Sequence, residues 1–191
     1  MGLSLTGRFP EYSTYGGDIL FKVHNQIEEE IVIAASLGAH EVMELHEVLC
    51  GTIDGLNKFQ LLKPFVRDQR LQSMLNNQLQ FMSQEYNNIV QTLNQQGMGQ
   101  AVPYRAPKNA APVYGLDNPA AQSPNMSPDQ LDDRDVCSMM LMFHKSSAVL
   151  KMHGALECAD PNLRRMLQQS AMNCSEQAYE VWQYMNQNGY Y

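Results

Sequence analysis

The chain has 191 residues, which is enough for one domain of ordinary size or two very small ones. Its 13 Lys and Arg stand against 20 Asp and Glu, and the formal charge of -7 argues against nucleic acid as a partner, because phosphate binding needs a basic surface. The longest apolar run, residues 31–35, is far below the ~20 residues needed to cross a bilayer, so no membrane span is expected. The first twelve residues also lack the apolar segment of a secretion signal, which predicts synthesis in the cytoplasm.

The N-terminal extension, residues 1–35, contains one stretch with helical spacing. Apolar side chains recur every three or four residues over 18–35, and this spacing predicts a helix in addition to those that follow. The segment 27–35 also fits a strand, so the sequence leaves both forms open. The positions that follow the helical spacing are Leu20, Val23, Ile27, either Glu30 or Ile31, and Ala34.

The first helical hairpin is predicted over residues 36–97. Its first helix, near 37–61, has apolar residues at alternating spacings of three and four and ends before Pro64. Its second helix, near 69–96, has the same spacing, with Asp68 as the N-cap and Gly97 as the stop. The expected core positions are Val42, Leu45, Leu49, Thr52, Leu56 and Phe59 in the first helix, and Leu75, Leu79, Met82, Tyr86, Ile89 and Leu93 in the second.

A proline-rich segment, residues 98–128, follows the first hairpin. It contains six of the nine prolines, which excludes a regular helix or strand. Extended at ~3.1 Å per residue, a segment of this length reaches along a whole long helix. We therefore expect a crossover strap, and we use the name strap for residues 98–128.

The second helical hairpin is predicted over residues 129–191, with helices near 130–157 and 161–188. Asp160 followed by Pro161 is typical of an N-cap and a first helical position, and Gly189 is typical of a C-terminal stop. The expected core positions are Val136, Met140, Phe143, Ser147, Leu150 and Gly154 in the first helix, and Leu167, Ala171, Cys174, Ala178, Val181 and Met185 in the second.

The two hairpins are related by a shift of 92 residues. Residues 68–97 and 160–189 share nine identities without a gap, where unrelated sequences would share about two, which indicates an internal duplication. Two helical hairpins joined by a long crossover predict an all-α fold, a ferritin-like four-helix bundle that forms one domain over residues 36–191.

A di-metal centre in such a bundle needs a Glu from each of two helices and a Glu-x-x-His motif from each of the others. The helix near 69–96 contains one acid, Glu85, and the helix near 161–188 contains Glu176 and Glu180, but neither has a histidine. Catalytic motifs such as G-x-S-x-G or a glycine-rich phosphate loop are also missing from the sequence. We therefore expect no metal site, no cofactor and no enzyme activity.

The strongest remaining metal-binding candidate is the pair His40 and Glu44. These residues are i, i+4 neighbours, a spacing that can chelate a divalent ion at a helix surface. The preferred interpretation is a solvated, acidic helix start that suits the helix dipole. His144, His153 and Glu157 have no matching carboxylate pattern, so they are interpreted as core or surface residues.

The four cysteines lie far apart and form no CxxC motif, which argues against a zinc finger or a thioredoxin-type site. They are Cys50, Cys137, Cys158 and Cys174, and buried thiols are the expected state. Cys137 and Cys174 fall at different heights of one hairpin, so no disulfide between them is expected within one chain.

Glutamine and tyrosine are abundant, with 18 Gln and 9 Tyr beside 6 Lys. Residues in the strap and at the chain end are open to enzymatic cross-linking, whereas the alternative is that the amides only solvate the helix faces. Two interpretations are also open for the aromatic C-terminus: it closes the end of the bundle, or it forms a docking surface. The residues concerned are Gln95, Gln96, Gln187, Tyr104, Lys108, Tyr114, Tyr179, Trp182, Tyr184, Tyr190 and Tyr191.

Residues 132–191 carry several features in a fixed order. They are an acidic start at Asp133 to Asp135, a Lys-Ser pair at 145–146, the helix junction ALECADPNLRRML and the ending YMNQNGYY. This pattern resembles the coat F domain of bacterial spore coat proteins. The resemblance extends over nearly the whole chain through MELHEVL, GMGQAVPYRAPKN and NPAAQSPN.

The resemblance implies a ferritin-like helical protein of endospore-forming bacteria with a structural role and no established catalysis. Such a protein would be made in the mother-cell cytoplasm and deposited in the spore coat. The expected partners are other spore coat proteins and further copies of the chain itself. The alternatives are a ferritin-like metal-binding or redox protein with an atypical site, and an adaptor that binds a specific partner through the strap.

Overall fold

The computed structural model describes residues 37–94, 102–108, 111–115 and 123–191. Four long helices and no strands occur in these residues, and Gly38–Tyr191 form one compact unit. The helix or strand expected within residues 18–35 and the stop expected at Gly97 lie outside the described residues.

The predicted all-α class is confirmed, and each of the four predicted helices is present. The bounds differ from the predicted ones by three residues at most: α2 is Ala39–Leu62, α3 is Gln69–Leu93, α4 is Asp133–Glu157 and α5 is Pro161–Gln187. Two 3-10 turns, η1 at Lys63–Phe65 and η2 at Pro128–Gln130, precede the starts of α3 and α4.

Aspartates mark the starts of three helices. Asp68, Asp132 and Asp160 each accept hydrogen bonds from the backbone N–H groups two and three positions further along the chain. Pro161 occupies the first position of α5, and Gly189 has a φ of 68°, in the left-handed region that ends helices. The caps predicted at Asp68 and Asp160 and the stop predicted at Gly189 are therefore confirmed.

Each hairpin also supplies a carboxylate to the helix junction of the other hairpin. Asp133, at the start of α4, accepts hydrogen bonds at 2.7 and 3.1 Å from the backbone N–H groups of the two residues before α3. Glu41, in the first turn of α2, accepts hydrogen bonds at 2.8 and 2.7 Å from the two residues before α5. Donors and acceptors of the two contacts are each 92 residues apart in the sequence.

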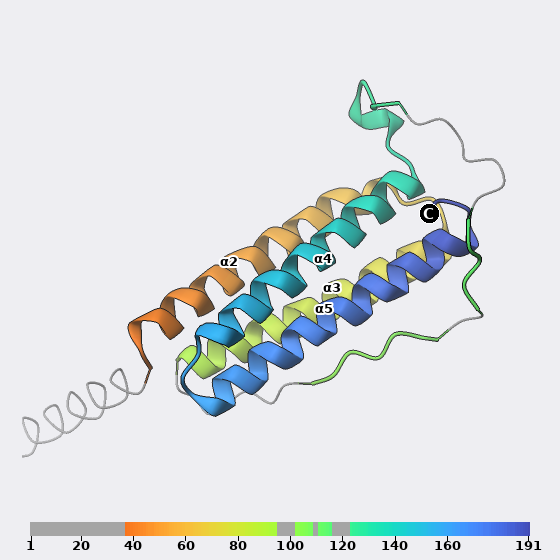
Figure 1. The fold of residues 1–191 in the computed structure, drawn as a ribbon. Coiled ribbons are helices and arrows are strands. Elements are labelled where there is room, and N and C mark those ends of the chain that lie inside the picture. Colours follow the sequence, from red (N-terminus) through yellow and green to blue (C-terminus); the bar gives the residue numbers. More distant parts are fainter. Residues whose placement is uncertain (1–36, 95–101, 109–110, 116–122) are drawn as a thin grey trace, which may run out of the picture. The chain divides into compact units, whose positions relative to one another are not determined.

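The helices pack side by side, with α2 beside α4 and α3 beside α5 (Figure 1). The start of α3 contacts the end of α5 and the end of α3 contacts the start of α5, so these two helices are antiparallel. In contrast, α3 and α4 are parallel, because Gln78 meets His144 and Glu85 meets Lys151. A parallel pair needs a connection that returns along the helices, and the strap provides it.

The core contains most of the positions predicted from the sequence, together with residues that were not predicted, such as Leu71, Leu141 and Leu163. Leu75, Ile89, Leu167 and Val181 are fully buried or nearly so, which places both long repeats with their apolar faces inward. Phe59 and Phe143 fill the space between α2 and α4, and their rings pack edge to face at 5.4 Å. Tyr86, Leu93, Val42, Leu56 and Leu150 lie at the margin of the core and are partly exposed.

Helix α4 is apolar on its outer face as well as on its inner face. Met142, Val149 and Leu156 are 65%, 72% and 60% exposed and follow one another at intervals of seven residues. Met152, between them, is also exposed. No helix in the described part of the chain is long and apolar enough to cross a membrane.

Candidate functional site

Polar side chains lie inside the helical unit in two layers. Gln78 and His144 belong to one layer, and Glu85 and Lys151 belong to the other. The members on each helix are seven residues apart, so the layers are about 10 Å apart at helical rise. All four side chains are buried, and such groups are tolerated inside a protein only when they are hydrogen-bonded.

The first layer is a hydrogen-bonded chain from α4 to the strap. Nε2 of His144 donates to Oε1 of Gln78 at 2.9 Å, and Nε2 of Gln78 donates to Oε2 of Glu180 at 2.8 Å. The hydroxyl of Tyr104 donates to the same Glu180 oxygen. The Tyr104 ring packs edge to face on Phe81, so this strap residue is held by both its ring and its hydroxyl.

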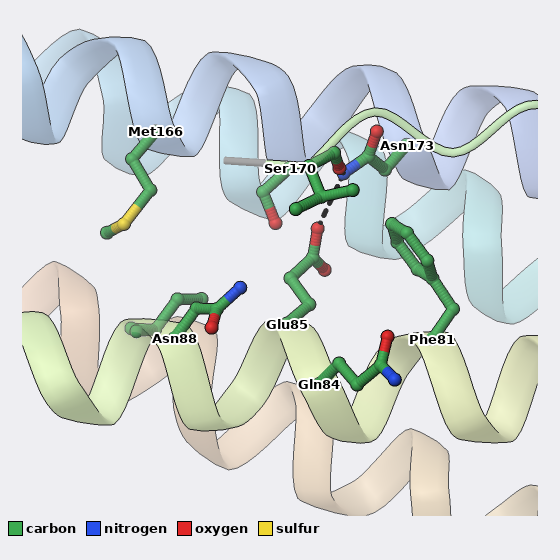
Figure 2. A pocket seen from close by; sticks show the side chains of 9 residues that line it. Phe81, Gln84, Glu85, Asn88, Met166, Ser170 and Asn173 are labelled. Atoms are coloured by element: carbon green, nitrogen blue, oxygen red, sulfur yellow. Dashed lines mark hydrogen bonds between the residues drawn. The ribbon is translucent and has the colours of Figure 1, made fainter. Parts of the chain in front are cut away.

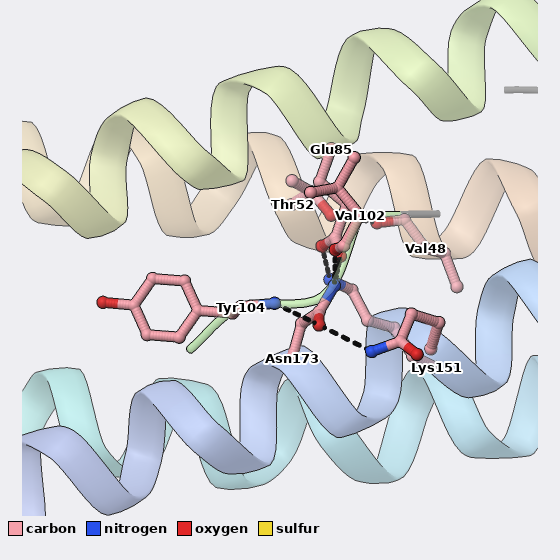
Figure 3. A network of polar contacts seen from close by, with 8 residues as sticks. Val48, Thr52, Glu85, Val102, Tyr104, Lys151 and Asn173 are labelled. Atoms are coloured by element: carbon pink, nitrogen blue, oxygen red, sulfur yellow. Dashed lines mark hydrogen bonds and ion pairs between the residues drawn. The ribbon is translucent and has the colours of Figure 1, made fainter. Parts of the chain in front are cut away.

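The second layer is centred on the carboxylate of Glu85, which holds two nitrogens (Figure 3). Nζ of Lys151 donates to Oε2 at 2.5 Å, and Nδ2 of Asn173 donates to Oε1 at 2.9 Å. A buried ion pair of this kind is tolerated because the remaining carboxylate oxygen also has a donor. The layer therefore joins α3, α4 and α5 through one side chain.

Asn173 also fastens the strap. Its Nδ2 donates to the carbonyl oxygen of Val102 at 3.0 Å, and its Oδ1 accepts from the backbone N–H of Tyr104 at 2.9 Å. The same Oδ1 accepts a hydrogen bond from Nε2 of Gln169 at 3.0 Å. Every hydrogen-bonding group of the Asn173 amide is thus directed, so the plane of the amide is fixed (Figure 3).

Burial determines the protonation of the first layer. It lowers the pKa of His144 to about 3, with a smaller contribution from the Lys151 charge, so the imidazole is neutral. Its proton is on Nε2, because that atom faces the carbonyl oxygen of the Gln78 amide. Burial, followed by the hydrogen bond to Glu180, raises the pKa of Tyr104, so the phenol keeps its proton and donates it.

In the second layer, burial and charge act in opposite directions on Lys151. Burial disfavours the ammonium, but the neighbouring Cys174 and Glu85 outweigh it and hold the pKa of Lys151 above its usual value. The resting state of the Glu85–Lys151 pair is therefore an ion pair. Burial raises the pKa of the Cys174 thiol, and the charge of Lys151 acts against this.

A small cavity of about 40 Å³ lies beside the second layer, between α3 and α5 (Figure 2). Glu85 of α3, Asn173 of α5 and Val102 of the strap are among the residues that line it. Ser170 lines it too, and its hydroxyl has no hydrogen-bond partner among the described residues. The cavity has room for a molecule of the size of water and a polar wall to receive it.

The metal-binding candidates of the sequence analysis do not come together. His40 is exposed, and Glu44 has its contact with Nε2 of His153, at 3.8 Å. His144 is buried in the polar core, whereas Glu157 is exposed. Among the described residues, no group of three or more His, Cys, Asp or Glu side chains is arranged to hold a metal ion.

The cysteines differ in burial. Cys137, Cys158 and Cys174 are buried, Cys50 is exposed, and all four are free thiols. Burial, with lesser effects of nearby carboxylates, raises the pKa of Cys137 to about 12 and that of Cys158 to about 11. Thiolate chemistry is therefore suppressed at both positions.

The aromatic residues at the end of the chain have mixed environments. The ring of Tyr184 is buried and packs on Tyr190, whereas Tyr179 and Trp182 are stacked and partly exposed. Tyr191 is 54% exposed and lies under the ammonium of Lys145. At this end of α5, Tyr184 therefore fills the end of the helical unit, whereas Tyr179 and Tyr191 are exposed at the surface.

The sequence reasoning missed Gln78, Lys151 and Asn173, and it gave Tyr104 a role only as an exposed cross-linking residue. One signal was present. His144 and Lys151 are polar residues seven apart on a helix that is apolar on both sides, and Gln78 and Glu85 repeat this spacing on α3. Polar residues with the period of the core line indicate a polar layer inside a helical protein.

The fold and site define a class of protein before any comparison: an all-helical protein with parallel middle helices, a strap between them and a polar core. The Coat F domain family matches residues 132–191. The Spore coat protein F-like protein YhcQ of Bacillus subtilis (strain 168) is 31% identical over 156 residues, which cover 81% of this chain and 72% of that protein. No solved structure matches. The chain belongs to the spore coat protein F-like family, as its sequence pattern predicted.

Proposed function

We propose that the chain is a structural, non-catalytic component of the bacterial spore coat, a helical unit packed against other coat proteins or further copies of itself. Family membership supports a role in the spore coat, because the matching relative is named a spore coat protein F-like protein. Synthesis in the mother cell and deposition on the forespore belong to the same proposal.

The outer face of α4 is the observation that carries the packing role. Met142, Val149 and Leu156 form an exposed apolar line over four turns of one straight helix, with Met152 beside it. Exposed apolar patches of this kind mark surfaces that other proteins cover. The low charged fraction, 17%, adds little electrostatic repulsion between neighbouring molecules.

Spore fractionation tests this function. The chain should be found in the coat extract and be missing from the core fraction. Val149→Glu with Leu156→Glu should reduce its retention in the coat, whereas Lys145→Glu with Ser146→Glu, on the same exposed part of α4, should reduce it less. Recovery of the wild-type chain in the core fraction would contradict the proposal.

We further propose a ferritin-like bundle that arose by duplication of one hairpin. The parallel α3 and α4 with a long crossover match the connectivity of bundles that have one crossover. The reciprocal carboxylate contacts of Asp133 and Glu41, 92 residues apart, support the duplication. An experimental structure in which the two hairpins do not superpose at this offset would reject it.

The second candidate function is a ferritin-like metal-binding or redox protein. Its support is the i, i+4 spacing of His40 and Glu44 in the sequence, since the structure gives Glu44 a contact with His153 instead, and metal analysis of the purified chain distinguishes the two functions. If the purified chain contains stoichiometric iron, manganese or zinc, the metal-binding function is favoured over the structural one.

Cross-linking in the mature coat is a further part of the structural proposal. Tyr114 is 89% exposed and Gln187 is exposed, so both are accessible to a modifying enzyme, whereas Gln95 and Gln96 lie outside the described residues. Tyr104 is a poor candidate, because its ring and hydroxyl are engaged. Mass spectrometry of coat digests should find linkages at Tyr114, Tyr191 or Lys108 before the helix interiors.

A further inference from the structure

The second polar layer brings together an amine, a carboxyl group and a carboxamide in a buried site. We propose that Lys151 and Asn173 join covalently, through an amide bond between Nζ and Cγ, with Glu85 transferring the proton and ammonia as the leaving group. The product is an internal cross-link between α4 and α5. The bond is a single self-modification, so it is compatible with a coat component that turns over no external substrate, and it does not depend on the proposed coat function.

Glu85 is placed to activate the amine. Its Oε2 accepts from Nζ of Lys151 at 2.5 Å, and the side chains of both residues are at least nine-tenths buried. Proton transfer along this one hydrogen bond turns the resting ion pair into a neutral amine, and burial assists that step because it disfavours the ammonium. A neutral lysine amine is a nucleophile, and a carboxylate in contact with it is a general base.

Asn173 is placed as the electrophile. Its carbonyl oxygen accepts two N–H hydrogen bonds, from Tyr104 at 2.9 Å and from Gln169 at 3.0 Å. Fixed N–H donors on a carbonyl oxygen stabilise the negative charge that forms there when an amine adds to the carbon. The leaving nitrogen, Nδ2, donates to Oε1 of the same Glu85 carboxylate at 2.9 Å, so the general base is also within reach as the general acid.

The steps balance with no external reagent. Glu85 takes one proton from the ammonium of Lys151, and the Nζ lone pair then forms a bond with Cγ of Asn173. The tetrahedral carbon expels Nδ2 as that nitrogen gains one proton from Glu85 and another from Nζ. The Cγ–Nδ2 bond breaks and the Cγ–Nζ bond remains. The nitrogen leaves as ammonium, which is ammonia together with the proton that Lys151 first gave to Glu85; no group is oxidised or reduced, and Glu85 ends unprotonated once it has passed its proton on.

The cavity beside the site suits the leaving molecule. It is about 40 Å³, and Glu85 and Asn173 are both part of its wall. Ammonia is similar in size to water, so the cavity can receive it at the point where it forms. The two helices are already antiparallel neighbours in one hairpin, so the reaction demands no rearrangement of the fold.

The test is the intact mass of the full chain, purified in its folded state and incubated until the mass no longer changes. The expected mass is that of the sequence minus one ammonia molecule. A tryptic digest should then contain a branched peptide in which residues 146–164 and 166–191 are joined, with no cleavage after Lys151. Fragmentation of this peptide locates the link at Asn173.

Two variants should keep the full mass: Glu85→Gln, which removes the proton carrier, and Lys151→Arg, which keeps a cation beside Glu85 but is not a nucleophile. Asn186→Ala is the matched control, because Asn186 also holds the strap through its amide but contacts no lysine, and this variant should still lose ammonia. Circular dichroism confirms that each variant is helical.

The wild-type chain decides the question even if the variants do not fold. A folded wild-type chain with the full sequence mass after incubation overturns the proposal. Loss of ammonia with only linear peptides, as from a succinimide at Asn173, overturns it as well. Spore fractionation is a separate measurement, so failure of this inference leaves the coat function open and the reverse also holds.

Discussion

Positions 92 residues apart carry different chemistry although they occupy similar places in the two hairpins. Gln78 and Glu85 on α3 are hydrogen-bonded across the core, whereas their counterparts on α5, Ser170 and Gln177, have side chains without a partner among the described residues. On the other helices, the counterparts of His144 and Lys151 are Thr52, which bonds back to its own helix, and Phe59, which packs on aromatic rings. The helix frame is common to both hairpins, whereas the polar network joins α3, α4 and α5 and leaves out α2.

The strap explains why the polar network lies beside α3 and α5. Tyr104 and the backbone around it complete the hydrogen bonds of Asn173 and Glu180, so the strap satisfies polar groups on α5 that face α3. The α2–α4 side has aromatic and glycine contacts instead. Polar groups in a helical core are therefore placed where an extended segment can supply partners for them.

The largest difference in stability between the two hairpins should appear when Glu85 and its counterpart Gln177 are substituted. Glu85→Gln leaves the Lys151 ammonium buried without a carboxylate, and a loss of about 4 kcal/mol in unfolding free energy is expected. Gln177→Leu replaces an unpartnered buried amide and should be neutral or stabilising. Urea denaturation measures both, and similar effects at the two positions would remove the distinction between the halves.

The reciprocal carboxylates should, in contrast, behave alike. Glu41→Ala and Asp133→Ala each leave two backbone N–H groups at a helix junction without their acceptor, and each should cost about 2 kcal/mol. Glu47→Ala, at an exposed site of α2, is the control and should change stability by less than about 0.5 kcal/mol.

Glu41 should also show a pH dependence of known sign. The backbone hydrogen bond from Asp160 is the main cause that lowers the pKa of Glu41. Since the folded pKa is below the unfolded value of 4.5, the stability that Glu41 provides is present above pH 4.5 and lost as the pH falls through the folded pKa. The difference between wild type and Glu41→Ala should therefore shrink below pH 4.5, and a constant difference down to pH 2 would contradict this.

His144 should give the stability of the protein a second pH dependence. Its folded pKa of about 3 is below the unfolded value of 6.5, so between these two values His144 is protonated in the unfolded chain and neutral in the folded chain. Stability should fall by about 2 kcal/mol between pH 7 and pH 5 through this residue alone. His144→Gln should remove this part of the pH profile, whereas His153→Gln, at an exposed site, should leave it intact.

The smallest expected effect is a contrast between two glycines of α2. A Cβ on Gly55 would lie 1.9 Å from Cζ of Phe143, whereas one on Gly51 would lie 3.1 Å from a flexible methyl of Leu150. Phe143 is confined by Phe59 and His144, so Gly55→Ala should lose about 1 kcal/mol after its gain in helix propensity. Gly51→Ala should be neutral or slightly stabilising, and thermal unfolding compares the two.

Local signals explain why the helices were predictable. The three-four spacing, Asp160 before Pro161 and the proline content of the strap are each complete within a short segment. The predicted start at 130 was three residues early, because Pro128–Gln130 form a 3-10 turn and Asp132 caps the helix with Asp135. Helix ends depend on such caps rather than on periodicity.

The polar site was not predictable in the same way, because its contacts join distant segments. Lys151 and Glu85 are 66 residues apart, and a single lysine in a helix is usually a surface residue. Asn173 looked like one more amide in an amide-rich helix, and its role depends on the strap passing over it. Periodicity places a residue on a face of its own helix but does not show which partner faces it.

Apart from the Tyr104 side chain, the strap is held by its main chain. Side-chain amides of α5, those of Asn173, Gln183 and Asn186, bind backbone atoms of Val102, Tyr104, Pro107 and Val113. Backbone atoms are the same in every residue apart from the missing N–H of proline, so this attachment is indifferent to most strap side chains. Substitution of the exposed Tyr114 side chain should therefore leave the attachment of the strap at Val113 intact, so this position can carry a foreign side chain or label.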